Sequence, residues 1–317
     1  RIYLMGMPVI LLYNFEAAIF RSIGDTKVPL MALLLSGILN VLLNLFFVIA
    51  LKMTVNGVAI ATVTSNAVSS LVLLRRLMGT DQSIHVELRK LRIHWRTLGQ
   101  ILKIGLPAGI QSAVFSVSNI VIQSAINSLG KVVMAASSAA FNIEIFAYDV
   151  LNSFSQACTT FVGQNYGAGK IQRCKKTLYL TLVEDTIASG LAILLVLVSG
   201  RYLLAIFNND PEVIAIGYTR LVTIFSAYVF SMLYEVMSGY LRGFGISLAP
   251  AVLTMLGVCG IRLAWIRWVF PAHRTFRTIM LVYPVSLSVT AVLIFLALLA
   301  CHPARRFRET HVPSVSD

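Results

Sequence analysis

The sequence predicts an all-α polytopic membrane protein, and three observations carry that prediction. Of its 317 residues, 57% are hydrophobic and 12% are charged, whereas soluble domains carry about 25% charged residues. The mean hydropathy is +0.82, which is more apolar than a soluble fold of this size can bury. Apolar segments of membrane-spanning length also recur along the whole chain. The composition excludes a cytosolic enzyme, a nucleic-acid-binding protein and a secreted disulfide scaffold.

Nine segments are long enough to cross a bilayer, which takes about 20 apolar residues in a helix. Turn-forming residues separate them, as at Gly24-Asp25 and at Asn208-Asn209-Asp210-Pro211. The predicted spans are residues 2–20, 28–51, 56–74, 101–127, 132–163, 177–199, 213–241, 249–270 and 279–300.

The basic residues predict how these spans are oriented. If residue 1 lies outside, 17 Lys and Arg residues fall in cytoplasmic loops and six fall in external loops. That asymmetry is the positive-inside distribution of membrane proteins, and it accounts for much of the net charge of +13. We therefore expect the C-terminus to lie in the cytoplasm.

An internal repeat relates residues 12–29 to residues 233–250. At an offset of 221 residues, five of 18 positions are identical: Leu12/Leu233, Tyr13/Tyr234, Arg21/Arg242, Gly24/Gly245 and Pro29/Pro250. Internal repeats are common in transporters. The repeat predicts a twelve-helix protein of two six-helix lobes, truncated at its N-terminus, so that about 120 residues with three helices would precede Arg1.

Four parts follow from this prediction. Residues 1–77 are the last three helices of the N-lobe, 78–100 a cytoplasmic connector, 101–303 the six-helix C-lobe and 304–317 a cytoplasmic tail. The connector mixes apolar and basic residues, which indicates a solvated or interfacial linker. A nucleotide or lipid-headgroup site is the alternative.

Polar side chains recur on one face of four predicted spans. Steps of three, four or seven residues place each set on a single helix face. In span 101–127 they are Ser112, Ser116, Asn119, Gln123 and Asn127; in span 132–163 they are Ser137, Glu144, Tyr148, Asn152, Ser155 and Thr159. Shorter sets are Ser36, Asn40 and Asn44, and Thr62, Asn66 and Ser69. We expect the long sets to line a cavity, with interhelical hydrogen bonding as the alternative; for the short sets the two are equally consistent.

Charged residues inside the spans indicate ion coupling. A carboxyl group in a low-dielectric environment takes up a proton more readily than one in water, and Glu144 lies near the middle of its polar face, with Asp149 five residues on. Arg262 lies within span 249–270, where a lone guanidinium group is costly. We expect Arg262 to pair with Glu144, either as a switch that opens on protonation or as a static ion pair.

Other chemistry finds no support in the sequence. Gly167–Lys170 lacks the spacing of a phosphate-binding loop, and the five histidines lie in loops or the tail, away from any second metal-ligand type. The four cysteines are scattered. We expect no catalytic residues, no metal site and no cofactor, so that transport would be driven by a gradient of H⁺ or Na⁺.

Several segments resemble the multidrug and toxic compound extrusion (MATE) family, over essentially all of residues 1–303. The most specific is Val162-Gly-Gln-Asn-Tyr-Gly-Ala-Gly169; others are Arg21–Pro29, Gly37–Asn40, Gly57–Thr62, Lys103–Pro107 and Leu241–Gly245. The overall pattern is most similar to the DinF-like bacterial branch. The resemblance places Arg1 in the fourth of twelve helices.

The resemblance implies an ion-coupled exporter of cationic or amphiphilic organic compounds. It assigns Asn40 and Thr62 to a cation site in the N-lobe, but Asn44 stands where many members have Asp. A second cation site, known from the vibrio-type branch, would fall on Phe115 and Ser231, which are not carboxylates. Glu144 is therefore the better carboxylate in the C-lobe.

These observations lead to one preferred function and two alternatives. We expect an antiporter that works by alternating access in the bacterial inner membrane, with coupling residues Glu144, Asp149, Asn40, Asn44 and Thr62. Its substrate cavity would contain Asn119, Gln123, Tyr148, Asn152 and Arg262. Its partners would be a small organic substrate and the lipid bilayer, with no nucleic acid, and the chain would be a monomer. The alternatives are a flippase for lipid-linked oligosaccharides and a non-transporting or inactive membrane fragment.

Overall fold

The computed structural model describes residues 1–301 and 303. These residues form helices and no strand, in agreement with the predicted all-α class. They divide into two compact units, one that ends at His94 and one that begins at Trp95. The division falls inside the predicted connector, whose last residues already belong to a helix that begins at Trp95. The predicted tail 304–317 lies outside the described residues.

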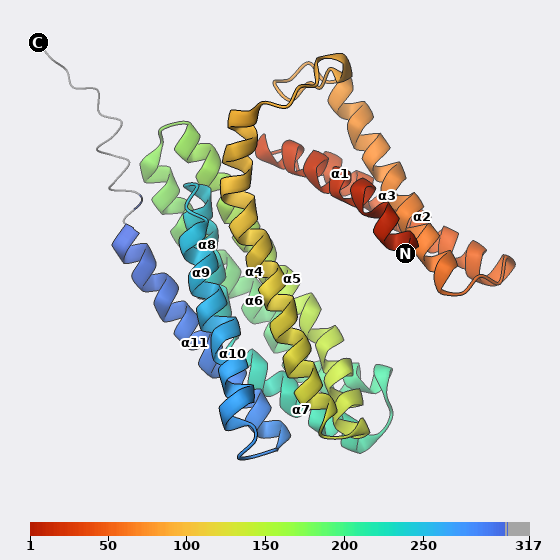
Figure 1. Ribbon diagram of the computed structural model, residues 1–317, viewed down its shortest axis with the longest axis vertical. Coiled ribbons are helices and arrows are strands. Elements are labelled where there is room, and N and C mark those ends of the chain that lie inside the picture. The colour runs from red at the N-terminus through yellow and green to blue at the C-terminus, as the bar shows by residue number, and fades with distance from the viewer. Residues whose placement is uncertain (302, 304–317) are drawn as a thin grey trace, which may run out of the picture. The chain divides into compact units, whose positions relative to one another are not determined.

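The first unit consists of three long helices (Figure 1). They are α1 (Ile2–Ser22), α2 (Lys27–Leu45), which continues as the π-helical segment η1 (Phe46–Ala50), and α3 (Val55–Met78). α3 packs against both α1 and α2. A small core closes their contact, formed by Ala17, Phe20, Ala32, Leu73 and Leu77. A short 3₁₀ turn, η2 (Leu88–Lys90), follows in the connector.

The second unit contains the remaining helices. They are α4 (Trp95–Asn127), α5 (Lys131–Gly167), α6 (Ile171–Phe207), α7 (Pro211–Phe225), α8 (Tyr228–Gly243), α9 (Leu248–Thr254), α10 (Ile261–Ala264) and α11 (Phe276–Cys301). The π-helical segments η3 (Met255–Gly260) and η4 (Trp265–Val269) flank α10 and make one continuous helical segment with α9 and α10.

The nine predicted spans all fall on helices, but not all as expected. By length and composition, seven helices of the described residues could each cross a membrane, and an eighth span arises if α7 and α8 count as one. The predicted span 213–241 is in fact this pair, bent by 47°. The helix for span 132–163 is the 37-residue α5, which is absent from the set of apolar helices. Its many polar and charged side chains account for this.

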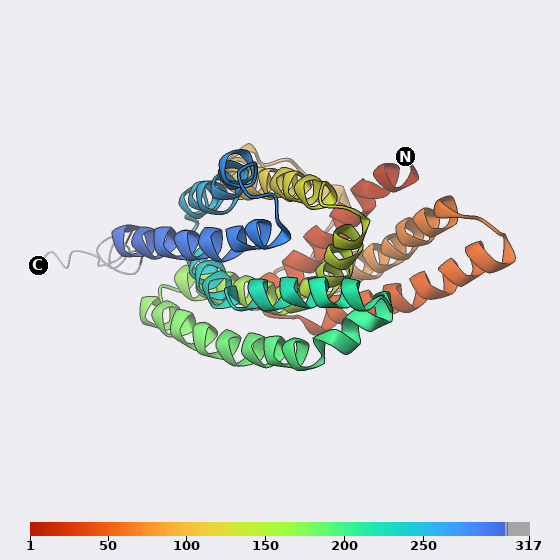
Figure 2. The ribbon, with the colours of Figure 1, turned by 90° about the horizontal axis from the view of Figure 1, so that it is seen from below.

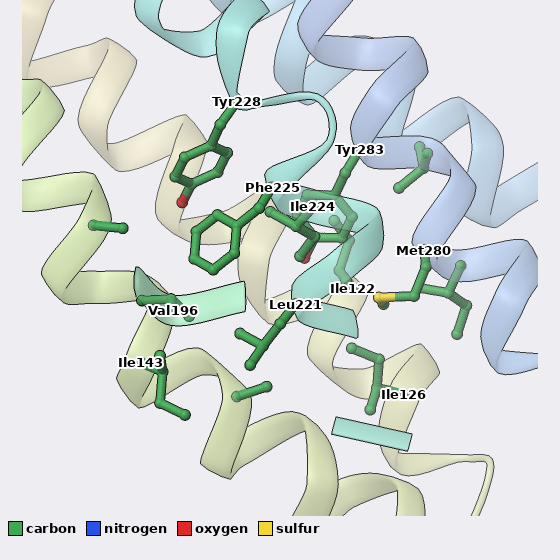
Figure 3. Packing of buried hydrophobic residues seen from close by; sticks show 14 of the residues in the cluster. Ile122, Ile126, Ile143, Val196, Leu221, Ile224, Phe225, Tyr228, Met280 and Tyr283 are labelled. Carbon is green, nitrogen blue, oxygen red and sulfur yellow. The ribbon is translucent and has the colours of Figure 1, made fainter. Parts of the chain in front are cut away.

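α7 and α8 occupy the middle of the second unit. They contact α5 and α6 on one side and α11 on the other (Figures 1 and 2). Figure 3 shows the core that results, in which Leu221 and Ile224 of α7 lie among Ile122, Ile143 and Met280 of the surrounding helices. Most other apolar side chains of the long helices are exposed, as expected for surfaces that face lipid.

The turns after α1 and α8 support the repeat. The two helices end at Ser22 and Gly243, and the helices that follow them also begin 221 residues apart. In each turn the glycine has a positive φ, 86° at Gly24 and 79° at Gly245. Each glycine N–H donates to the carbonyl oxygen of the arginine three residues before it, at 3.0 Å and 2.8 Å. The equivalence therefore extends from residue identities to backbone conformation.

Candidate functional site

A cavity of about 210 Å³ lies within the second unit. α4, α5, α7, α8, α10 and α11 all contribute side chains to it. Six of the fourteen lining residues are aromatic: Phe115, Phe141, Tyr148, Tyr228, Tyr234 and Tyr283. Three are charged: Glu144, Arg220 and Arg262. The cavity thus combines aromatic walls with two guanidinium groups and one carboxylate.

Glu144 of α5 is held by Arg220 of α7. Arg220 donates from Nε to Oε1 at 2.6 Å and from Nη2 to Oε2 at 2.9 Å, a bidentate geometry. Its Nη1 donates to Ser137 Oγ at 2.7 Å. The side chains of Arg220 and Glu144 are 3% and 8% exposed, so the pair is shielded from water.

The predicted pairing of Glu144 with Arg262 is therefore wrong. Arg220 is the partner because it lies on the buried face of α7, and α7 packs against α5. One feature of the sequence pointed to Arg220: it lies within predicted span 213–241, where its guanidinium group needs an anion as much as that of Arg262 does. The sequence does not show how each helix is rotated, and the rotation decides which anion each arginine meets.

Arg262 has different neighbours. Its guanidinium carbon lies 4.5 Å from the centroid of the Tyr283 ring and 5.5 Å from that of Phe115. Its Nε donates to Ser286 Oγ at 3.3 Å. The Tyr283 ring also lies 5.7 Å from the guanidinium carbon of Arg220, so one aromatic ring contacts both cations.

A second polar network lies between α5 and α8. Arg242 Nη2 is 3.8 Å from Glu235 Oε2 and donates to Ser155 Oγ at 3.0 Å. Ser155 Oγ donates to the carbonyl oxygen of Glu235, and Tyr148 Oη lies 3.5 Å from Glu235 Oε1. In the first unit, Glu16 Oε2 accepts a hydrogen bond from Ser70 Oγ at 2.9 Å.

The polar face of α5 therefore serves two purposes. Glu144 and Tyr148 line the cavity, whereas Ser155 and Thr159 donate to backbone carbonyl oxygens of α8. The cavity and the interhelical hydrogen bonds that were alternatives for this face are both present, on successive turns of one helix.

The predicted cavity residues are only partly brought together. Asn119, Tyr148 and Arg262 line the cavity. Gln123 does not, and its side-chain amide donates to Asn127 Oδ1 on its own helix. Asn152 is half-buried and Asp149 is exposed, and neither contributes to the lining.

The residues of the first unit that were predicted to bind a cation lie close together. Asn40 Nδ2 lies 3.4 Å from Thr62 Oγ1 and 3.3 Å from Ser65 Oγ, and Asn44 Nδ2 donates to Asn40 Oδ1 at 3.0 Å. Asn44 Oδ1 is buried and has no hydrogen-bond partner. The cluster therefore offers neutral oxygen atoms without a carboxylate. Nowhere in residues 1–301 and 303 do three His, Cys, Asp or Glu side chains gather as metal ligands would.

The fold and this cavity define a polytopic membrane protein with a polar site inside a helical bundle. The family model MatE matches residues 107–266, half of the chain, and this stretch contains most of the cavity. The chain therefore belongs to the MatE family, as the sequence motifs predicted.

Known relatives agree with this assignment. The chain is 26% identical over 305 residues to the probable multidrug resistance protein YoeA of Bacillus subtilis, covering 93% of this chain and 65% of that protein. It is 24% identical over 265 residues to the probable multidrug resistance protein NorM of Thermotoga maritima, covering 82% and 56%. The chain thus spans a little over half to about two thirds of the length of these relatives.

A solved structure shows the same fold. A crystal structure of a MATE protein in the straight conformation superposes with a TM-score of 0.88 at 19% identity, covering 98% of this chain and 69% of the other.

Proposed function

We propose that this chain is part of an exporter of small organic compounds, driven by a proton or sodium gradient and working by alternating access. The observation that carries the proposal is the cavity in the second unit, where aromatic walls surround a buried Glu144–Arg220 pair. The relatives named above are described as probable multidrug resistance proteins, which supports efflux. Cavities of this composition suit organic ligands, because apolar surface supplies contact and a few polar groups supply orientation.

Coupling is assigned to two places. In the second unit, Glu144 is the only carboxylate among the cavity-lining residues that the structure describes. A proton bound to Glu144 would compete with its bond to Arg220, so that protonation and pair opening are linked. In the first unit, Asn40, Asn44 and Thr62 would bind the coupling cation through their oxygen atoms, and the unpartnered Asn44 Oδ1 supports this role. Asp149, which is exposed, has no place in this scheme.

The proposal includes the arrangement of the complete protein. Residues 1–77 would be the last three helices of one lobe and residues 101–303 the six helices of the other, in a monomer in the bacterial inner membrane. The positive-inside distribution supports a cytoplasmic C-terminus. A flippase for lipid-linked oligosaccharides would need several basic residues in the cavity, and only one guanidinium there lacks a carboxylate within the described part of the chain.

Export from vesicles tests the proposal. The full-length protein would be reconstituted and loaded with fluorescent aromatic compounds of either charge, under a proton gradient, a sodium gradient or neither. We expect gradient-dependent export, and Glu144→Gln should lose that dependence while Glu184→Gln, at an exposed carboxylate of α6, retains it. Export that depends on neither gradient would overturn the coupling proposal, and no export at all would overturn the function.

A further inference from the structure

The charge balance of the cavity is the starting point. Its lining contains two guanidinium groups and one carboxylate. The carboxylate, Glu144, is taken up in a bidentate bond by Arg220. One positive charge, on Arg262, therefore remains without an anion within 4.0 Å among residues 1–301 and 303. A buried unpaired charge is costly, and a site that keeps one is a candidate for binding the opposite charge.

The surroundings of Arg262 use only one of its hydrogen-bond donors within the described residues. An arginine has five N–H donors, and the structure gives Arg262 one hydrogen bond, from Nε to Ser286 Oγ at 3.3 Å. The Tyr283 and Phe115 rings attract the cation, but a ring face supplies no oxygen acceptor. The residue is only 4% exposed, so the remaining donors point into protein or cavity and not into bulk water.

The helix that carries Arg262 is locally irregular. α10 has four residues between two π-helical segments, η3 and η4. π-helical segments inside α-helices are rare and are frequent at functional sites. Arg262 lies between these two segments and lines the cavity.

We propose that Arg262 is an anion-binding residue and that this cavity takes an aromatic compound with a carboxylate or phosphate group. The anion would meet the free guanidinium donors in a charge-assisted, two-point contact. The ring of the ligand would lie among Phe115, Tyr148 and Tyr234, which line the same cavity. This inference rests on the proposed function and narrows its substrate class, because the resemblance alone implied cationic compounds.

Binding of one ring system in three charge states tests the inference. The probes are 2-naphthoate, 2-naphthylmethanol and 2-naphthylmethylammonium, which share the naphthalene ring and differ in charge. Their affinity for the purified full-length protein is measured by equilibrium dialysis in vesicles of zwitterionic lipid. We expect the anion to bind at least about tenfold more tightly than the other two, as one charge-assisted contact allows. Tighter binding of the cation, or equal binding of all three, would overturn the inference.

Two substitutions of Arg262 and one control test whether the preference for the anion depends on Arg262. Arg262→Gln should abolish the preference for the anion, and Arg262→Lys, which retains the charge, should keep it in part. Arg267→Gln removes an exposed arginine five residues further along and should leave it unchanged. If the Gln variant does not fold, the Lys variant and the wild-type series still decide. Retention of the full preference in Arg262→Gln would place the anion elsewhere and overturn the assignment.

Further experiments distinguish this inference from its alternatives. Repeating the dialysis with anionic lipid in the vesicles distinguishes a soluble anion from a lipid headgroup; loss of naphthoate binding there would assign the site to lipid and overturn the substrate class. Gradient-driven export that prefers the cation would overturn the inference while leaving the proposed function intact. Naphthoate binding without export would support the inference and count against the function.

Discussion

Removal of either partner of the Glu144–Arg220 pair should destabilise the protein more than removal of both. Arg220 Nε lies 2.6 Å from Glu144 Oε1 and Arg220 Nη2 lies 2.9 Å from Glu144 Oε2, and both side chains are almost fully buried. Loss of one partner leaves the other as an uncompensated buried charge, which costs about 3–5 kcal/mol of unfolding free energy. The double variant Glu144→Gln/Arg220→Gln leaves no such charge. Because the double variant should cost less than either single variant, we expect a coupling energy of at least about 3 kcal/mol in a double-mutant cycle.

The assay is reversible unfolding in mixed detergent micelles, followed by circular dichroism, for the wild type, both single variants and the double variant. The matched control is the cycle of Glu144→Gln with Arg262→Gln, which tests the pairing expected from the sequence. Its coupling energy should be clearly smaller, because the bonds of Glu144 go to Arg220. Additive effects of the Glu144 and Arg220 substitutions, or stronger coupling to Arg262, would refute the reasoning.

Three further predictions concern packing, turns and coupling. Gly239→Ala should lower the unfolding free energy by about 1–3 kcal/mol, because its Cβ would lie 2.5 Å from the carbonyl oxygen of Ser155. The control is Gly190→Ala, whose Cβ would have nothing within 4 Å; it should be neutral or stabilise the protein by about 0.5–1 kcal/mol. Equal effects at both glycines would contradict the close contact of α5 with α8. Ala in place of Gly24 or Gly245 should cost about 1–2 kcal/mol at either site, since both have a positive φ; a loss at one site alone would argue against equivalent turns. Asn44→Asp should lower the sodium concentration that half-activates export and Asn44→Ala should raise it, whereas an unchanged value in both would remove Asn44 from the cation site.

Much of the fold follows from local sequence. Apolar segments and their turn residues place most helix ends to within about eight residues, the largest miss being the end of α6 at Phe207, because each helix must satisfy its own backbone in lipid. The repeat could also be found in advance, since the turn after α1 needs a glycine at Gly24 and a second copy needs one at Gly245. The bend between α7 and α8 was not foreseen, because no proline or glycine marks Ser226 and Ala227.

The site was harder to predict, for a geometric reason. A polar face tells which side chains of one helix share a direction, as for Glu144 and Tyr148 of α5, but not which helix lies opposite. Arg220 and Arg262 both lie inside predicted spans, so composition could not decide which of them meets Glu144. The cluster in the first unit was easier to predict, because Asn40 and Thr62 lie on adjacent helices joined by a short loop. The family resemblance had also assigned both residues to a cation site.

The most direct test of the account asks whether a transported compound occupies the cavity of the second unit. Asn119 lines that cavity, and three of the four native cysteines are buried. The full-length Asn119→Cys variant would be labelled with a water-soluble thiol reagent, with and without a compound that the same preparation exports, in parallel with Arg267→Cys at an exposed position. We predict that the compound slows labelling at position 119 and not at position 267. Equal labelling rates at position 119, in a variant that still exports the compound, would contradict the account.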